Sequence, residues 1–377
     1  MSDPGPLPTV RLDDAGAVAA ALPHLLGFPP EESLVVVSLR GGEVGLTARV
    51  DLPPAEHSRT VARELARAVG TAQPTGVLLV VVSEADDDRA QGLPHRRLLH
   101  EAVLAFTATG VRVGDALLVR GGRWWSYDCP HACCAPDAGT PLPGGTSELA
   151  AVSVLAGRVL ESDRAALAGR IAPQPSPGMA RACEQVGDDL AARTAERGWD
   201  AVAEEGWDAV LAAVDGASPE RAVRLTDRQV ARLAWGLRDT DLRDRALTLA
   251  LGSTAPAAQA LWTELTRRAP VPLDAAPATL LAVSAWLRGD GALANLALDR
   301  ALRSEPSYTL AGLLRGALDA CLPPEAVREV IRGVADPLDA DPLDADPLDA
   351  DPLDADPLDA DPLDADPLDA GPLDAGR

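Results

Sequence analysis

The sequence predicts an α/β domain, formed by a mixed sheet with hairpins and covering helices, followed by an all-α domain and a disordered acidic tail. Up to residue 128, short segments rich in valine and leucine alternate with segments of helical periodicity, a pattern typical of strands alternating with helices. From residue 146 to 334 helical patterns follow one another without a convincing strand pattern. A five-residue repeat, Asp-Pro-Leu-Asp-Ala, then begins. We therefore expect three regions, at residues 1–145, 146–335 and 336–377.

The strands of the first domain are indicated by short apolar runs. The expected strands are residues 34–39, 44–52, 77–82, 113–119 and 124–127. A hairpin turn is expected at Gly41-Gly42 and a second at Gly121-Gly122. Helices are expected after Asp14, near residues 57–69 and near residues 95–108. Because hairpins give antiparallel pairs and helical crossovers allow parallel ones, the sheet should be mixed.

The second region shows helix-start signals and one pattern typical of a helical repeat. Thr146-Ser147-Glu148, Ser218-Pro219-Glu220 and Thr226-Asp227 each carry a capping residue or a first-turn proline. Five residues are spaced like the small and apolar positions in the second half of a tetratricopeptide repeat: Gly289, Ala294, Leu298, Ala301 and Pro306. In the first half, Ala278 and Ala285 stand where the repeat has aromatic residues. A repeat-like hairpin and ordinary bundle packing are both consistent with this pattern, and we expect the helical domain to bind a protein partner.

The tail consists of seven copies of Asp-Pro-Leu-Asp-Ala and one of Gly-Pro-Leu-Asp-Ala. A proline at every fifth position prevents a continuous helix, and repulsion between the aspartates opposes compaction. One leucine per repeat is too little apolar surface for a core. We therefore expect residues 336–377 to be disordered.

Charge and composition exclude several classes of function. The net charge of the chain is −23. The tail contains 15 of the 57 acidic residues and only one of the 34 basic residues, so residues 1–335 carry a net charge of −9. A chain of this charge repels nucleic acid, which we do not expect as a partner. All basic residues are arginine. The absence of lysine excludes a standard Walker A loop, a Schiff base and a pyridoxal-phosphate site.

Hydropathy predicts a cytoplasmic protein that does not cross a membrane. The longest apolar run, residues 77–82, is far too short to span a bilayer. The N-terminal residues lack the basic and apolar segments of a secretory signal. In the cytoplasm, cysteines stay reduced and structural disulfides are not expected.

The strongest chemical signal is a cluster of cysteines after the aromatic segment of the first domain. Cys129, His131, Cys133 and Cys134 are four residues of the types that bind zinc. Their spacing is not that of a standard zinc site, and no second cysteine pair is present. Three interpretations remain open: zinc ligands, a redox pair between Cys129 and Cys133 or Cys134, and cysteines that only pack.

A second pair of candidate residues lies in the strand expected at residues 44–52. Arg49 and Asp51 are two residues apart, so both point to one face of the sheet, opposite to the apolar residues of that strand. They would either line a pocket or form an ordinary ion pair on the surface. The sequence contains neither a Gly-x-Ser-x-Gly nor a Gly-x-Gly-x-x-Gly motif after a strand.

Four segments together resemble the actinobacterial domain of unknown function DUF4192. They are residues 23–36, 46–53 and 125–134, and the helical segment 289–302. The resemblance extends over roughly residues 10–333. It implies an intracellular protein and supplies no activity, ligand or catalytic residue.

These observations favour a non-enzymatic regulatory or protein-interaction protein with a cysteine-lined site. The first alternative is a metal-dependent enzyme that uses Cys129, His131, Cys133 or Cys134 as ligands, with Arg49 and Asp51 as groups that handle substrate or protons. The second alternative is a thiol redox sensor based on the same cysteines.

Overall fold

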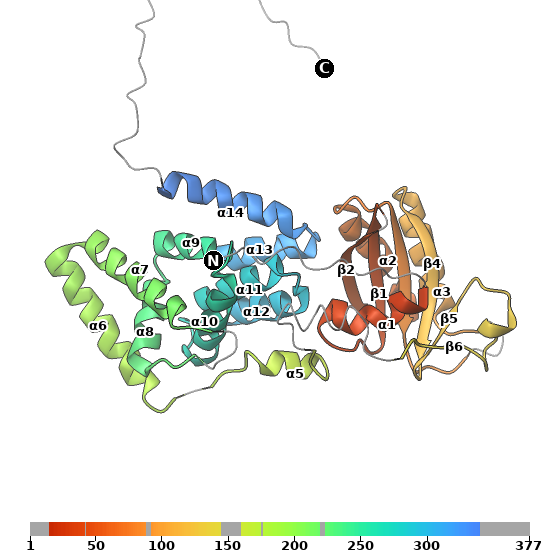
Figure 1. Ribbon diagram of the computed structural model, residues 1–377, viewed down its shortest axis with the longest axis horizontal. Coiled ribbons are helices and arrows are strands. Elements are labelled where there is room, and N and C mark those ends of the chain that lie inside the picture. The colour runs from red at the N-terminus through yellow and green to blue at the C-terminus, as the bar shows by residue number, and fades with distance from the viewer. Residues whose placement is uncertain are drawn as a thin grey trace, which may run out of the picture. The chain divides into compact units, whose positions relative to one another are not determined.

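The computed structural model describes residues 15–41, 43–87, 92–144, 160–174, 176–218 and 223–339 (Figure 1). The expected domain boundary at residue 145, two of the three expected helix starts and the tail from residue 340 onward therefore lie outside or partly outside the described residues. The fold class expected from the sequence is confirmed: a mixed sheet with helices is followed by a long series of helices.

In the described part of the chain, six strands form one sheet in the order β2-β1-β3-β4-β5-β6. Their bounds are β1 (Ser33–Arg40), β2 (Glu43–Asp51), β3 (Gly76–Val82), β4 (Arg112–Arg120), β5 (Arg123–Ser126) and β6 (Thr140–Pro141). Strand β1 pairs antiparallel with β2 and β3, whereas β3 and β4 are parallel. Strands β4, β5 and β6 are antiparallel neighbours. The mixed sheet and both hairpins were predicted, and the short strand β6 was not.

Helices cover both faces of this sheet because its central strands are apolar on both sides. On one face, side chains such as Val36 and Leu79 pack against helices α2 (Ser58–Gly70) and α3 (Arg96–Ala108). On the other face, Val35 and Val80 pack against helix α1 (Ala15–Leu26). Successive residues of one strand therefore belong to two different cores, as the alternation of side chains along a strand requires.

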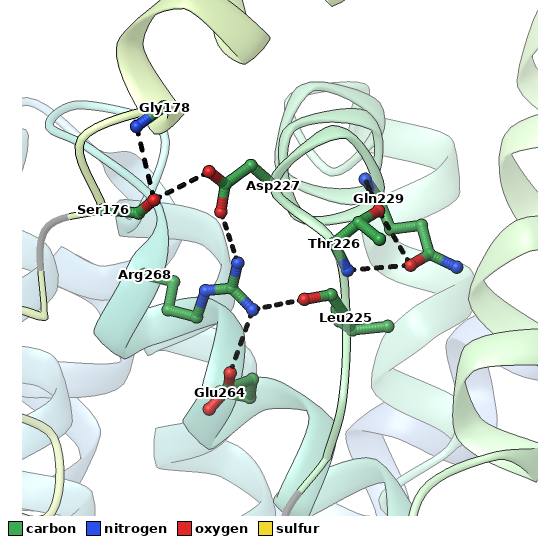
Figure 2. Close-up of polar contacts among 8 residues, drawn as sticks. All are labelled: Ser176, Gly178, Leu225, Thr226, Asp227, Gln229, Glu264 and Arg268. Atoms are coloured by element: carbon green, nitrogen blue, oxygen red, sulfur yellow. Dashed lines mark hydrogen bonds and ion pairs between the residues drawn. The ribbon is translucent and has the colours of Figure 1, made fainter.

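From residue 160 onward, the described part of the chain contains ten helices. They are α5 (Arg164–Gly169), α6 (Met179–Arg197), α7 (Trp199–Asp215), α8 (Asp227–Gly236), α9 (Thr240–Thr248), α10 (Ala255–Arg268), α11 (Ala275–Leu287), α12 (Gly291–Ser304), α13 (Thr309–Asp319) and α14 (Pro324–Asp339). The helix start expected at Thr226 is confirmed: the Thr226 hydroxyl accepts from the Gln229 N–H, and the Gln229 side chain accepts from the Thr226 N–H (Figure 2). This reciprocal cap satisfies two N–H groups that the helix cannot pair by itself.

Helices α11 and α12 form a closely packed hairpin. Every residue of α11 is buried. Ala285 of α11 and Ala294 and Ala301 of α12 are fully buried, so side chains of minimal size allow close approach of the two helices. Close packing at these small residues is what their spacing in the sequence predicts, and it does not require the aromatic residues of a complete repeat.

The last helix extends past the position at which the tail is expected to begin. Helix α14 continues to Asp339, so it includes the first four residues of the expected tail. A single proline removes one backbone hydrogen bond and disturbs the preceding turn. In this structure the helix continues past that first proline and ends two residues later.

Candidate functional site

The loop after β5 brings three cysteine side chains together. The Sγ atoms of Cys129 and Cys133 are 3.9 Å apart, and those of Cys133 and Cys134 are 4.0 Å apart. All three sulfur atoms lie within 4.8 Å of one another. A short 3-10 turn, Ala132–Cys134, presents the last two cysteines from adjacent positions. The sequence therefore places three thiols at one point, although their spacing matches no standard pattern.

Side chains of β5 hold the backbone of this loop in place. The Trp125 Nε1–H donates to the Ala135 carbonyl at 3.0 Å. The Arg123 guanidinium donates to the carbonyls of Ala138 and Gly139 at 2.8 and 2.9 Å. Gly139 has a φ of 63°, and a Cβ at this position would overlap the Trp125 ring. The strand thus fixes the loop through three hydrogen bonds and one close contact that requires glycine.

The three thiols differ in acidity because their surroundings differ. The N–H of His131 lowers the pKa of Cys129 below its ordinary value, since a hydrogen bond to the sulfur favours the thiolate. Burial raises the pKa of Cys134 to about 11, although the Ser126 N–H donates to its sulfur at 3.3 Å. Cys129 is therefore the first of the two to ionise and the more reactive nucleophile at neutral pH.

His131 contributes its backbone to the loop. Its carbonyl accepts from the Cys134 N–H at 3.0 Å, and its N–H stabilises the Cys129 sulfur. Among the described residues, the group whose ligand atoms lie together consists of Cys129, Cys133 and Cys134 without the His131 ring. The three sulfurs are spaced for a metal ion: a Zn–S bond of about 2.3 Å in tetrahedral geometry puts two sulfurs about 3.8 Å apart.

Arg49 and Asp51 lie on β2 and form an ion pair at 2.7 Å. Asp51 is 83% exposed, whereas Arg49 also donates to the Glu31 carbonyl at 3.2 Å. Their position on one face, opposite the apolar residues of β2, agrees with the sequence prediction. Strands β1, β3 and β4 lie between β2 and β5. At about 4.8 Å per strand, β2 and β5 are roughly 19 Å apart, so this pair and the cysteines do not form one site.

The structure also contains a polar cluster that was not predicted from the sequence. The Ser83 hydroxyl donates to Glu32 Oε2 at 2.8 Å and lies 3.0 Å from His95 Nε2. The N–H groups of Glu84 and Ala85 donate to Glu32 Oε1 and Ser83 Oγ at 2.8 and 3.2 Å. The cluster thus joins the start of β1, the end of β3 and the start of α3.

Two features mark this cluster as unusual. Glu32 and His95 have φ values of 36° and 60°, a region that residues other than glycine rarely occupy. Ser83 follows β3 directly and so lies at the carboxyl end of the parallel pair β3–β4, the edge at which α/β proteins bind ligands. A polar residue directly after the apolar strand at residues 77–82 was the sequence signal for it.

Comparison with known proteins identifies the family of this chain. No curated protein and no solved structure matches the chain. Among the described residues, no helix is long and apolar enough to cross a membrane. The family model described as "Domain of unknown function (DUF4192)" matches residues 16–325. This match covers most of the chain, which therefore belongs to the DUF4192 family.

Proposed function

We propose that this protein is a non-enzymatic regulatory or interaction protein whose three-thiol site, Cys129, Cys133 and Cys134, binds a thiophilic metal ion, either zinc or monovalent copper. The observation that carries the proposal is the set of sulfur distances, 3.9 and 4.0 Å, in a loop that β5 already holds in place. Thiolates are the preferred ligands of both ions. A reducing cytoplasm, where we place the protein, would keep these thiols free.

A binding role is favoured over catalysis by the surroundings of the thiols. A catalytic zinc needs a neighbouring acid or base in addition to its ligands. Asp115 is a carboxylate near the cysteines, but its Oδ1 already accepts from the Ser126 hydroxyl and the Ala116 N–H, both at 2.8 Å, so this oxygen serves the structure of β4 and β5. Arg49 and Asp51, the other candidates, lie across the sheet. We further propose that the helices transmit the bound state to a protein partner, and that nucleic acid is not a partner because of the acidic charge.

Metal analysis tests this proposal. Protein purified without chelator is compared with a Cys133→Ser/Cys134→Ser variant, and with Cys183→Ser as the control, because Cys183 is buried in the helical core. We expect one ion per chain in the parent and control proteins and none in the double variant. If apo-protein titrated with Zn²⁺ and Cu⁺ shows no stoichiometric binding, the proposal is wrong.

A thiol sensor is a second candidate, favoured by the unequal acidity of the thiols. The Cys129 thiolate would attack the O–O bond of a peroxide to form a sulfenic acid while hydroxide leaves. The Cys133 thiol, whose sulfur is 3.9 Å away, would then attack the sulfenic sulfur and form a disulfide, and the sulfenic hydroxyl would leave with the thiol proton as water. A loss of two hydrogens in the mass of metal-free protein after mild peroxide, reversed by reductant, would support this function. Unchanged mass would exclude it.

A further inference from the structure

We propose that His95 is a phosphoryl acceptor: its Nδ1 atom is a nucleophile that takes a phosphoryl group from a small high-energy donor. The site lies at the carboxyl end of strand β3 and at the start of helix α3. Its members, Glu32, Ser83 and His95, come from three separate segments that meet at this edge. The inference is independent of the cysteine loop.

The first step of the argument is the tautomer of His95. Glu32 accepts N–H or O–H donors on both carboxylate oxygens, one of them from the Ser83 hydroxyl. A hydroxyl has one proton, so Ser83 has none left to donate to the imidazole. The contact of 3.0 Å between His95 Nε2 and Ser83 Oγ therefore requires Nε2 to carry the hydrogen and to donate it. In the neutral ring, Nδ1 then holds the free lone pair.

The second step is the protonation state. Partial burial lowers the pKa of His95 below its ordinary value, with the negative charge of Glu32 opposing this effect. An imidazole with a lowered pKa is neutral at pH 7, and only the neutral ring is a nucleophile. Among the described residues, the hydrogen bond of the His95 ring is made by Nε2, to Ser83. Ser83 is 1% exposed, so a phosphoryl donor cannot reach its hydroxyl. The role of this hydroxyl is to orient the His95 ring.

The third step concerns the charge of the product. His95 is the N-cap residue of α3, and Arg96 and Arg97 follow it directly. The N–H groups of a first helical turn and adjacent guanidinium groups both favour an added dianion. Arg96 lies over the Tyr127 ring at 5.5 Å, and Arg97 is exposed. Once Nδ1 carries the phosphoryl group and Nε2 keeps its hydrogen, the imidazole ring of His95 is positively charged. The Glu32 carboxylate, which is hydrogen-bonded to the ring by way of the Ser83 hydroxyl, balances this charge.

The transfer with phosphoramidate as donor is balanced without a further reactant. The Nδ1 lone pair attacks phosphorus and forms an N–P bond, while the P–N bond of the donor breaks and ammonia leaves with its electron pair. The hydrogen on Nε2 stays in place, bonded to Ser83. The product is a histidine phosphorylated at Nδ1.

The test uses the full chain incubated with phosphoramidate at neutral pH. Peptide mass mapping locates the phosphoryl group among His24, His57, His95, His100 and His131, and ³¹P NMR distinguishes the Nδ1 from the Nε2 isomer. We expect His95 to be the main site, with phosphate on Nδ1. A His95→Gln variant should lose this signal, and His100→Gln, an exposed position on α3, should keep it.

A Ser83→Ala variant tests whether the Ser83 hydroxyl orients the His95 ring, because it removes the hydroxyl and keeps the ring. It retains His95 and removes the contact that fixes the hydrogen on Nε2, so the phosphorylated product should shift toward the Nε2 isomer. Circular dichroism verifies that each variant is folded. Equal modification of all exposed histidines, no modification of His95, or phosphate on Nε2 in the parent protein would each overturn the proposal.

Discussion

The Arg268 guanidinium lies 2.5 Å from the Asp227 carboxylate and joins the last turn of α10 to the first residue of α8 (Figure 2). The same guanidinium donates to the Leu225 carbonyl at 2.6 Å and reaches Glu264 at 3.2 Å. Asp227 also accepts from the Ser176 hydroxyl at 2.7 Å. Three segments of the helical region thus depend on one arginine.

Replacing Arg268 should therefore destabilise the protein more than replacing a surface arginine. Arg268→Ala removes bonds to a carboxylate and a carbonyl that are partly shielded from water, at an expected cost of about 1.5–3 kcal/mol for each charged hydrogen bond lost. Arg228, whose partner Asp189 is half exposed, is the control, and Arg228→Ala should cost at most about 1 kcal/mol. Urea unfolding gives both values. Equal losses would show that the Arg268 contacts contribute no more than a surface pair.

The Asp227 carboxylate should make part of the stability depend on pH. The Ser176 hydroxyl and then Arg268 lower the pKa of Asp227 below its ordinary value. A lowered folded-state pKa stabilises the fold above the ordinary carboxyl pKa, and this contribution is lost as the pH falls through the lowered value. In Asp227→Asn, the deficit in unfolding free energy should be largest at neutral pH and shrink toward about pH 3. A deficit that stays constant over this range would contradict the ion-pair explanation.

The acidity of the cysteines predicts an order of alkylation. Cys129 should react with iodoacetamide at lower pH than Cys134, because a hydrogen bond lowers the pKa of the first and burial raises that of the second to about 11. Peptide mass mapping of metal-free protein after short pulses at increasing pH measures both rates. Cys321, half-buried with a raised pKa, is an internal reference that should also react late. Faster reaction of Cys134 would show that the loop is arranged differently in solution.

Most of the sheet could be predicted from the sequence because its signals are local. Valine-rich runs, the Gly41 and Gly121 turns and the crossover helices together specify strands, hairpins and one parallel pair. Strand β6 is only two residues long, Thr140–Pro141, and is defined by its pairing with β5 rather than by any pattern of its own. Helix α14 extends four residues into the expected tail, since one proline removes a single backbone hydrogen bond.

The candidate sites were only half predictable. The three cysteines lie within six residues of sequence, Cys129–Cys134, so their clustering required no tertiary information. Glu32 and His95 are separated by 63 positions in the sequence, and their cluster with Ser83 forms only when β1 and β3 pair. No spacing rule joins residues that are so far apart, and the backbone strain at Glu32 and His95 is not visible in a sequence.

Gly139 tests whether the loop must be held in place before metal binds. A Gly139→Ala substitution forces a Cβ into the Trp125 ring at a positive φ, so the ring or the loop must move. Loss of the supporting contacts around a metal site typically lowers affinity about 10- to 100-fold. Gly144 is the matched control, because a Cβ there meets no atom within 4 Å. Competition with a chromogenic zinc chelator should show weaker binding for Gly139→Ala and unchanged binding for Gly144→Ala. Equal affinity in both variants would mean that the three thiols assemble around the ion without help from β5.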